Sequence, residues 1–347
     1  MKETRCPTCN IDINKRLHHR HRPWYKEPLY IVSIFTAVIL ALNLYMPVLN
    51  PLVDSILFYA NTIWWAILIG LLIGGFIAYF VPEEYVSKHL GYGSRAIPYA
   101  VVLGFLMSAC SHGILAIAVA LYKRGASTSA VIAFLLASPW ANLPMTVIMF
   151  AFFGLNAFIM ILGSLLIAVV SGFVFRLLES RNKVEKGNVI ETKKGFSVRA
   201  DIKKRVRNYR FKGSDITNIM KSSWDLAKAV LWWVIIGVIL ASFVGGYVPH
   251  EIMQTYFGPT LLGLFATLLI ASIIEVCSEG SSPLAFEIYR QTGAFGNSFT
   301  FLNAGVATDF TEIGIISSNI GKRTAIWTVL ITVPQILVLG YLFNIFV

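Results

Sequence analysis

The sequence predicts an all-α, polytopic membrane protein with two homologous repeats and one extra span at the N-terminus. Hydrophobic residues make up 56% of the 347 residues and charged residues only 14%, with a mean hydropathy of +0.68. A soluble domain carries about 25% charged residues. Apolar segments recur along the chain, each long enough to cross a hydrocarbon core of about 30 Å as a helix, and those of the second half repeat those of the first.

The chain begins with a polar tail, residues 1–27, in which Cys6 and Cys9 form a Cys-x-x-Cys pair. Two thiolates at this spacing supply half of a tetrahedral zinc site. Cys6 and Cys9 are therefore candidate metal ligands, which the histidines of the tail or a second subunit would complete. A tail without a metal is the simpler interpretation. No signal peptide is expected, because the first apolar run begins only at Leu29.

The apolar segments divide the rest of the chain into four regions. We expect an extra span within 28–54, a first repeat at 55–178, a basic linker at 179–222 and a second repeat at 223–347. Tryptophans near several span starts are typical of the membrane–water interface. The candidate spans lie at about 30–49, 56–80, 95–122, 127–153, 157–178, 224–247, 260–289, 295–319 and 323–346.

The two repeats align without a gap when the sequence is shifted by 167 positions. The shift places Trp65 on Trp232, and Cys110-Ser111-His112-Gly113 on Cys277-Ser278-Glu279-Gly280. Apolar residues would match by chance, but aligned tryptophan, cysteine and glycine would not. The sequence therefore predicts an internal duplication.

Positive charge predicts the topology of the repeats. Thirteen Lys or Arg residues accompany four acids between Arg176 and Lys212, and seven accompany three in residues 1–27. Such blocks mark the cytoplasmic side of a membrane and attract anionic lipids, so the net charge of +11 does not imply a nucleic-acid partner. Both blocks are cytoplasmic if 95–122 and 260–289 are re-entrant hairpins, which gives the repeats opposite orientations. Bent helices that cross fully are the alternative.

Acidic residues interrupt the apolar segments of the second repeat, where the first repeat is mostly neutral. A charged residue at the bilayer centre costs about 2.5–3.5 kcal/mol on insertion scales. Each of these acids is therefore a candidate for substrate binding or for proton or ion coupling. The five acids are Glu275, Glu279, Glu287, Asp309 and Glu312.

The two Cys-Ser-x-Gly motifs form the tips of the predicted hairpins. In the second motif, Ser281-Ser282-Pro283 is typical of a helix start, so the cysteine before it would lie near a helix N-terminus, which favours a thiolate. Inverted symmetry would bring both tips together, where thiolates, imidazole and carboxylate suit zinc, Cu(I) or a trivalent metalloid. Small residues at tight helix contacts are the alternative for the cysteines. The candidate substrate-binding residues at the tips are Cys110, Ser111, His112, Cys277, Ser278 and Glu279.

The fourth segment of each repeat is predicted to break near its middle. In the first repeat two prolines flank Asn142, and the aligned stretch of the second repeat contains Asp309. Broken helices expose backbone carbonyls, which are tolerated at membrane depth only where they line a cavity. Asn142 and Asn303 are therefore candidate substrate-binding residues, and Asp309 and Glu312 could exchange a proton or hold a cation. A packing kink would explain the prolines equally well.

The tips and the broken segments together resemble a known family. Besides the Cys-Ser-x-Gly pair, the stretches Lys123–Ser127, Ala133–Pro139 and Thr308–Gly314 are similar to those of the ArsP-like predicted permeases. This family includes organoarsenical efflux permeases and proposed copper/zinc exporters, and the resemblance covers about 60–345. It implies a polytopic permease that exports its substrate without an ATPase. Family members often have a second cysteine at the position of His112, so this chain leaves a metal ion open as the substrate.

These observations favour a secondary transporter of the cell membrane, with inverted repeats and a cytoplasmic N-terminus. We expect it to export a thiophilic metalloid or heavy-metal species, coupled to protons. The sequence has no Walker motif, and we expect neither enzymatic activity nor a cofactor. The expected partners are the substrate and the lipid bilayer, and a homo-oligomer is compatible. The alternatives are a permease for another solute or anion, bound at hairpin helix N-termini, and an intramembrane enzyme or redox protein.

Overall fold

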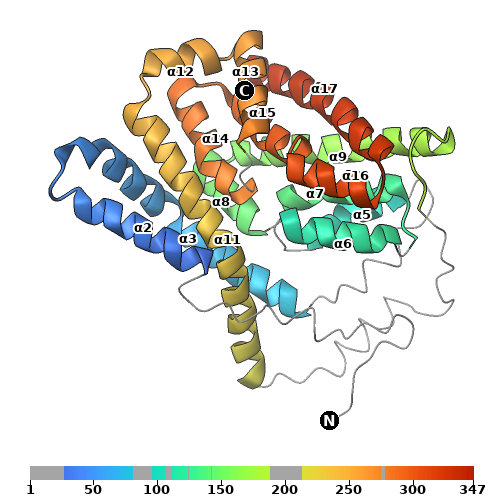
Figure 1. Ribbon diagram of the computed structural model, residues 1–347, viewed down its shortest axis with the longest axis horizontal. Coiled ribbons are helices and arrows are strands. Elements are labelled where there is room, and N and C mark those ends of the chain that lie inside the picture. The colour runs from blue at the N-terminus through green and yellow to red at the C-terminus, as the bar shows by residue number, and fades with distance from the viewer. Residues whose placement is uncertain are drawn as a thin grey trace.

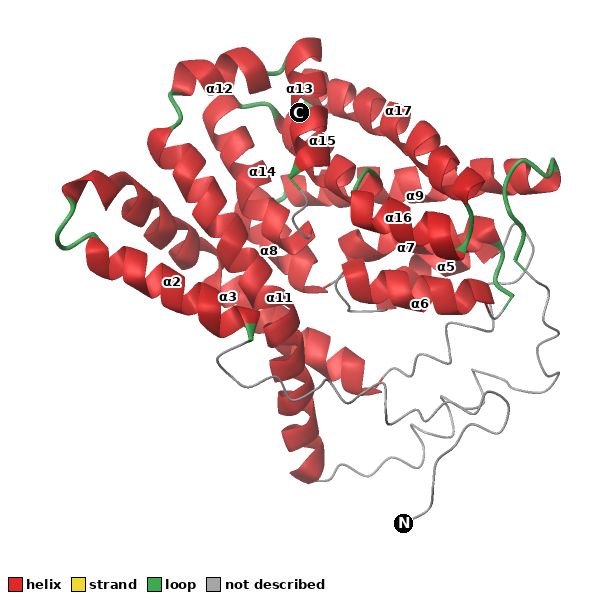
Figure 2. Ribbon diagram, in the orientation of Figure 1, coloured by secondary structure: helices red, strands yellow, loops and turns green. Residues whose placement is uncertain are grey.

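The protein is described as a computed structural model over residues 27–80, 96–106, 111–123, 125–141, 143–187, 213–274 and 278–347. Within these ranges every regular element is a helix (Figures 1 and 2). The all-α class predicted from the sequence is therefore confirmed. These ranges contain four helices long and apolar enough to cross a membrane, or up to six when each bent helix pair counts as one span.

The first half begins with a helix that is shorter than predicted. Helix α2 spans Pro28–Leu42, and a single turn of 3-10 helix, η2, follows at Pro47–Leu49. A span needs about 20 residues, so the predicted span at 30–49 is wrong in its extent. Met46 is extended, because a proline disfavours the helical conformation of the residue before it. The other helices are α3 (Asn50–Phe80), α5 (Ala96–Leu106), α6 (Ser111–Lys123), α7 (Thr128–Ala141), α8 (Leu143–Phe153) and α9 (Asn156–Ser180).

The helices of the second half start at positions that recur with the predicted offset. Helices α6 and α14 begin at Ser111 and Ser278, and α8 and α16 begin at Leu143 and Phe310, so that each pair is 167 residues apart. The pattern of helices and breaks in one half therefore repeats in the other. The second half consists of α11 (Gly213–Tyr247), α12 (His250–Phe257), α13 (Leu261–Ile273), α14 (Ser278–Thr292), α15 (Phe295–Ala307), α16 (Phe310–Asn319) and α17 (Lys322–Phe346).

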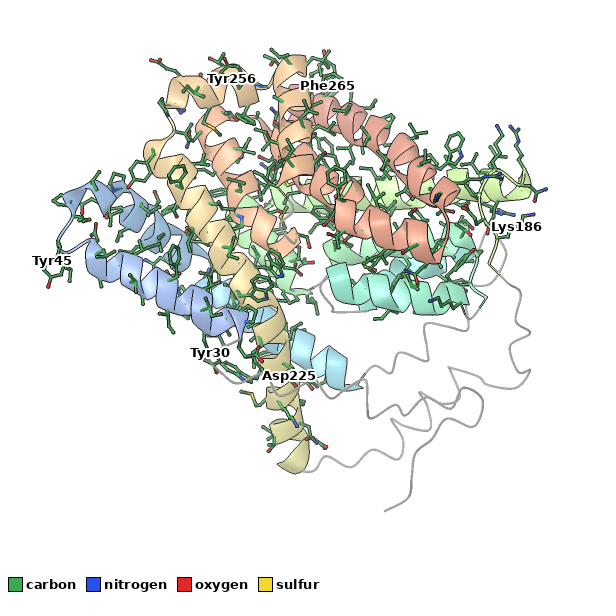
Figure 3. All side chains as sticks on the ribbon, in the orientation of Figure 1. Tyr30, Tyr45, Lys186, Asp225, Tyr256 and Phe265 are labelled. Carbon is green, nitrogen blue, oxygen red and sulfur yellow. The ribbon has the colours of Figure 1, made fainter. Side chains whose placement is uncertain are left out.

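The surface of the helical body is largely apolar. Large hydrophobic side chains are exposed on many helices, among them Leu262 at 71% and Ile273 at 74%. Figure 3 shows Tyr256 and Phe265, both exposed, on the outside of α12 and α13. Soluble monomers rarely expose contiguous apolar surface of this extent, so the outer face of these helices is suited to lipid.

One end of the body, here called the Glu185 end, is held together by the segment after α9. The Glu185 carboxylate accepts hydrogen bonds from the backbone N–H groups of Arg323 (3.1 Å) and Thr324 (2.9 Å) at the start of α17. The backbone carbonyl of Glu185 accepts a hydrogen bond from the hydroxyl of Thr128 at the start of α7. Lys123, at the end of α6, donates to Asn319 at the end of α16 (3.0 Å). Both halves therefore meet at this end.

The ionised form of Glu185 is favoured by these contacts. Partial burial acts in the opposite direction, but the hydrogen bonds from the Thr324 hydroxyl and from the N–H groups of α17 outweigh it and hold the pKa of Glu185 below its usual range. A carboxylate at a helix N-terminus also complements the helix dipole. Glu185 therefore acts as a cap for α17 that is supplied by the start of the linker.

The opposite end, here called the Asn344 end, joins α12, α15 and α17. The Asn344 side chain accepts a hydrogen bond from the backbone N–H of Gly296 (2.7 Å). Next to it, the Asn297 amide donates to the carbonyls of Phe257 (2.8 Å) and Gly258 (3.0 Å). Helix α17 therefore runs from the Glu185 end to the Asn344 end, and α15 begins at the Asn344 end.

Helices α13 and α14 form a hairpin along α15. Near the Asn344 end, Asn297 on α15 contacts Thr267 on α13 (3.3 Å), and Ser298 donates to the carbonyl of Ala285 on α14 (2.6 Å). At the other end of α15, Ser272 of α13 lies 2.7 Å from the hydroxyl of Thr308. Helix α13 therefore runs parallel to α15, and α14 returns antiparallel to it. The hairpin opens at the Asn344 end.

Helices α5 and α6 pack on α7 in a corresponding way. Ile97 of α5 and Ala133 of α7 both contact Gly172, and further along Gly104 approaches Ser138 so closely that a Cβ would lie 2.8 Å from its hydroxyl oxygen. Helix α6 returns to Lys123 at the Glu185 end. The α5–α6 hairpin therefore opens at the Glu185 end, opposite to the α13–α14 hairpin. This is the arrangement expected of repeats with opposite orientations.

Candidate functional site

Four pairs of consecutive helices have one helix that ends, and the next that begins, between the two ends of the molecule. These pairs are α5 and α6, α7 and α8, α13 and α14, and α15 and α16. The contact of Ser272 with Thr308 joins the α13–α14 break to the α15–α16 break. The Ser282 hydroxyl donates to the sulfur of Met145 (3.1 Å), which joins the start of α14 to the start of α8. The start of α14 in the second half therefore lies against the start of α8 in the first half, and the ends of α13 and α15 lie together.

Helix α14 begins at Ser278, three residues earlier than the predicted start at Ser281-Ser282-Pro283. Pro283 lies inside the helix, where it has no N–H to donate to the carbonyl of Glu279. The Ser282 hydroxyl lies 3.1 Å from the carbonyl of Ser278 and 3.1 Å from the sulfur of Met145, so it can donate to either. The predicted start was too late by three residues because contacts of this kind stabilise a helical turn ahead of Pro283.

Glu279 lies in the first turn of α14 and is completely buried. Its carboxylate accepts a hydrogen bond from the hydroxyl of Ser278 (3.1 Å). The following turn packs tightly on α11, since a side chain at Gly237 would collide with the carbonyl of Gly280. Glu279 is therefore a carboxylate at a helix N-terminus, where the dipole stabilises negative charge, beside the break that precedes α14.

Asp309 occupies the α15–α16 break and is the N-cap of α16. Its carboxylate accepts hydrogen bonds from the backbone N–H groups of Thr311 (2.7 Å) and Glu312 (3.2 Å). These are two of the N–H groups that a helix N-terminus leaves unsatisfied. Asp309 is 8% exposed. Its charge is therefore used to start the second part of a broken helix.

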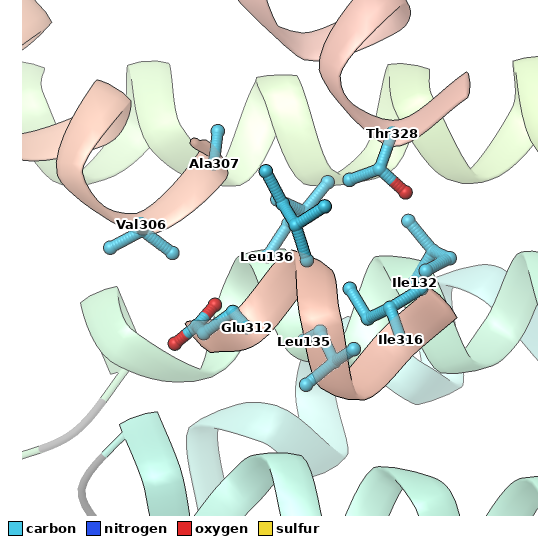
Figure 4. Close-up of a pocket in the computed structure, with 9 residues that line it drawn as sticks. Ile132, Leu135, Leu136, Val306, Ala307, Glu312, Ile316 and Thr328 are labelled. Carbon is cyan, nitrogen blue, oxygen red and sulfur yellow. The ribbon is translucent and has the colours of Figure 1, made fainter. Parts of the chain in front are cut away.

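Glu312 lies one turn into α16 and faces an almost entirely apolar pocket. The pocket has a volume of about 10 Å³, and its polar lining consists of Glu312 and Thr328. Figure 4 shows the Glu312 carboxylate near Val306 and Leu135, pointing away from Thr328. Leu135 belongs to α7 of the first half, whereas Glu312 belongs to the second. This buried carboxylate therefore lies at the contact between the halves.

Glu287 is also completely buried, but it lies away from the breaks. It is nine residues into α14, which corresponds to about 13 Å along a helix. Its carboxylate accepts hydrogen bonds from Arg290 (2.9 and 2.7 Å), from Gln291 (2.6 Å) and from the hydroxyl of Tyr59 on α3. Arg290 in turn lies 5.7 Å from the centre of the Phe58 ring. The structure therefore places Glu287 in an ion-paired network that joins α14 to α3.

Asn303 lies on α15, before the break. It is 5% exposed, and its amide donates to the carbonyl of Phe299 in the preceding turn (3.0 Å). Asn303 therefore stabilises its own helix through one amide N–H, and its carbonyl oxygen and second N–H can serve another partner.

Several predicted site residues lie outside the part of the chain that the structure describes. For Ser111 and His112 only the backbone is described, in the first turn of α6. Within the described ranges, no cluster of three or more His, Cys, Asp or Glu side chains is arranged to hold a metal ion. The predicted residues outside these ranges are Cys6, Cys9, Cys110, Asn142, Glu275 and Cys277.

Sequence reasoning missed the partners of Glu287. The spacing of Glu287 and Arg290 at i,i+3 was a signal for a salt bridge on one helix face. It also explains why a basic residue lies near the Asn344 end, which otherwise has few positive charges. Tyr59 carries no comparable signal, because it is 228 residues away in the chain.

Comparisons with known proteins agree with this architecture. A family model described as a predicted permease, of ArsP type, matches residues 49–345. The UPF0718 protein MJ0584 of Methanocaldococcus jannaschii is 23% identical over 86% of this chain and 96% of its own length. The UPF0718 protein YcgR of Bacillus subtilis is 23% identical over 79% of this chain and 90% of its own length. The "Putative permease Rv2963" of Mycobacterium tuberculosis is 24% identical over 60% of this chain and 56% of its own length. No solved structure matches the chain.

Proposed function

This chain belongs to the ArsP-type predicted permease family, and from that premise we propose that it is a secondary transporter that exports a thiophilic metalloid or heavy-metal species. Family membership and the apolar helices make it a multi-pass membrane permease. The substrate class, the direction of transport and coupling to protons are our inference. The basic Glu185 end is assigned to the cytoplasm, because Lys and Arg mark the cytoplasmic side of membrane proteins.

The observation that carries the proposal is the convergence of broken helices from both halves. Helices α6 and α14 begin at Ser111 and Ser278, so Cys110 and Cys277 each immediately precede a helix N-terminus. A cysteine at such a position has a lowered pKa in other proteins and is available as a thiolate. Two thiolates form a ligand set that selects soft metal ions and trivalent metalloids. Discontinuous helices meeting near the middle of the membrane are the usual substrate site of secondary transporters.

Other residues near the breaks complete the proposed site. His112 follows Cys110 in the first turn of α6, and Glu279 follows Cys277 in the first turn of α14. Both residue types bind the same borderline and soft metals. Glu275, Asn142 and Asn303 lie in or next to the breaks in sequence and would contact the substrate as it passes.

The buried acids argue against an anionic substrate. Asp309 already occupies the N–H groups at the start of α16, and Glu279 brings a carboxylate to the start of α14. Anions bind at helix N-termini through such N–H groups, and a neighbouring carboxylate would repel them. The site is therefore better suited to a cation or to a neutral metalloid species.

The proposal is tested with serine variants of the cysteines in the full-length protein. Cys110→Ser and Cys277→Ser would be expressed in a bacterial host sensitive to metals and arsenicals, and challenged with Zn²⁺, Cu⁺ or a trivalent organic arsenical. We expect each variant to lower the tolerated concentration of the transported species about tenfold or more, since loss of even an outer-shell partner of a metal costs about 10–100-fold in affinity.

Cys6→Ser and Cys9→Ser make the same chemical change in the tail. Because the simpler interpretation of the tail has no metal, they should retain the resistance of the unaltered protein, and loss of resistance in them would assign the tail thiolates to metal handling. Membrane levels of all four variants would be compared by immunoblot. Full resistance in both Cys110→Ser and Cys277→Ser would remove the thiolates from the mechanism.

A further inference from the structure

Among the buried acids, Glu312 has the fewest polar neighbours. The described residues give its carboxylate no hydrogen bond, although Glu312 is only 8% exposed. Glu287 and Asp309 each accept several hydrogen bonds, and Glu279 accepts one from Ser278. A buried carboxylate with so few polar neighbours among the described residues is costly to retain as a charge. An ionisable residue at membrane depth is therefore a functional group by default.

The pocket beside Glu312 is too small and too apolar for a metal ion. Its volume of about 10 Å³ is near the lower limit for a single water molecule. Calcium and magnesium ions need about six oxygen ligands, but this pocket has only the side-chain oxygens of Glu312 and Thr328. The remaining lining residues are Ile132, Leu135, Leu136, Val306, Ala307, Ile313 and Ile316. The described side chains around Glu312 therefore suit a proton better than a metal ion.

The charged groups around Glu312 are few. On its own helix, Asp309 lies one turn earlier, with its carboxylate bound to the N–H groups of that turn. The residues that α7, α15 and α17 contribute to the pocket carry no titratable side chain. Helix α16 also packs against α6, on which Lys123 contacts Asn319 at the far end of α16 and His112 lies in the first turn. No basic side chain described by the structure pairs with Glu312.

We propose that Glu312 is the residue that carries the coupling proton, whereas Asp309 positions it. Glu312 takes up a proton from hydronium, so that one O–H bond forms on the carboxylate as one breaks in hydronium, and it releases the proton to water by the reverse step. This inference deepens the proposed function, on which it rests for the direction of coupling. The spacing of Asp309 and Glu312 in the sequence suggested one shared role for both acids, whereas this inference gives them different roles.

The geometry explains how this proton would be linked to a conformational change. The neutral acid can remain beside the small pocket that α7 and α16 line together, because it needs no counter-ion. After deprotonation the carboxylate requires water or a cation, so the charged form favours separation of α7 from α16. Because these helices belong to different halves, the protonation state of Glu312 biases the relative position of the halves.

The test measures protonation directly and needs no substrate. Full-length protein would be reconstituted in phospholipid vesicles and titrated while the infrared carbonyl band of protonated carboxyl groups is recorded. We expect Glu312→Gln to lose a component of this band that the unaltered protein and Asp309→Asn retain. An unchanged band in Glu312→Gln, or loss of the same component in Asp309→Asn, would overturn the proposal. Thermal melting of each variant shows whether it is folded.

A second measurement separates this inference from the proposed substrate class. Vesicles containing a pH-sensitive dye would be exposed to a trivalent organic arsenical, with unaltered protein and Glu312→Gln in parallel. We expect the unaltered protein to move protons in response and Glu312→Gln to move none. The same assay would be repeated with Zn²⁺ and Cu⁺. Loss of the infrared component in Glu312→Gln without any response of the unaltered protein to the arsenical, Zn²⁺ or Cu⁺ would refute the substrate class and support the proton site. Equal proton movement in both proteins would refute the proton site.

Discussion

Asp309 and Glu312 show how two acids one turn apart differ in physical role. Asp309 begins α16 by accepting N–H groups, so its charge is balanced by the helix it caps. Glu312 has only apolar neighbours and Thr328 in its pocket. Their spacing predicts that they lie near one helix face, but it does not predict which one is bonded. That distinction depends on the break at Thr308, which turns one of them into a cap.

The capping role of Asp309 predicts different effects of two substitutions. Asn is about as good an N-cap as Asp, whereas Ala lacks the side-chain acceptor. We expect Asp309→Ala to destabilise the protein by about 0.5–2 kcal/mol and Asp309→Asn to cost much less. Thermal melting of the purified variants in the same detergent measures both. Equal melting temperatures for the two variants would show that Asp309 does not act as a cap.

At the scale of elements, the sequence predicted where helices break better than where they begin. The Cys-Ser-x-Gly motifs and the stretches around Asn142 and Asp309 each coincide with an interruption, because polar and helix-breaking residues are locally readable. The start of α14 and the length of α2 were predicted wrongly. Both depend on contacts or turns that composition does not encode, such as the Ser282 hydroxyl bond to Ser278.

The network around Glu287 predicts that α14 depends on Arg290. Removing one partner of a buried ion pair leaves an uncompensated charge and costs about 3–5 kcal/mol. Arg290→Gln should lie at the lower part of this range, because the Arg290 side chain is 44% exposed whereas that of Glu287 is completely buried. We expect the double variant Glu287→Gln with Arg290→Gln to be more stable than Arg290→Gln alone. Thermal melting of Arg290→Gln, Glu287→Gln and the double variant provides the comparison. A double variant that melts at a lower temperature than both single variants would contradict this expectation.

At the scale of the whole molecule, the two halves are related by direction as well as by sequence. The 167-residue shift predicted which elements correspond, and the charge count predicted that they run in opposite directions. The contacts at the Glu185 and Asn344 ends place the starts of α7 and α15, and the open sides of the two hairpins, at opposite ends of the molecule. The individual contacts between these segments, such as Ser272 with Thr308 and Ser282 with Met145, could not be read from the sequence, because the separation of these residues in the chain contains no periodic signal.

Opposite ends of the molecule should therefore be reachable from opposite sides of the membrane. Lys186 lies beside Glu185, and Leu155 is 87% exposed in the turn between α8 and α9 near the Asn344 end. We would introduce Lys186→Cys or Leu155→Cys into a variant in which the four native cysteines are serine, and treat cells with a membrane-impermeant maleimide. Because basic segments remain in the cytoplasm, intact cells should label Leu155→Cys only, and lysed cells should label both. Labelling of Lys186→Cys in intact cells would reverse the orientation, and labelling of both in intact cells would contradict the arrangement of the two ends.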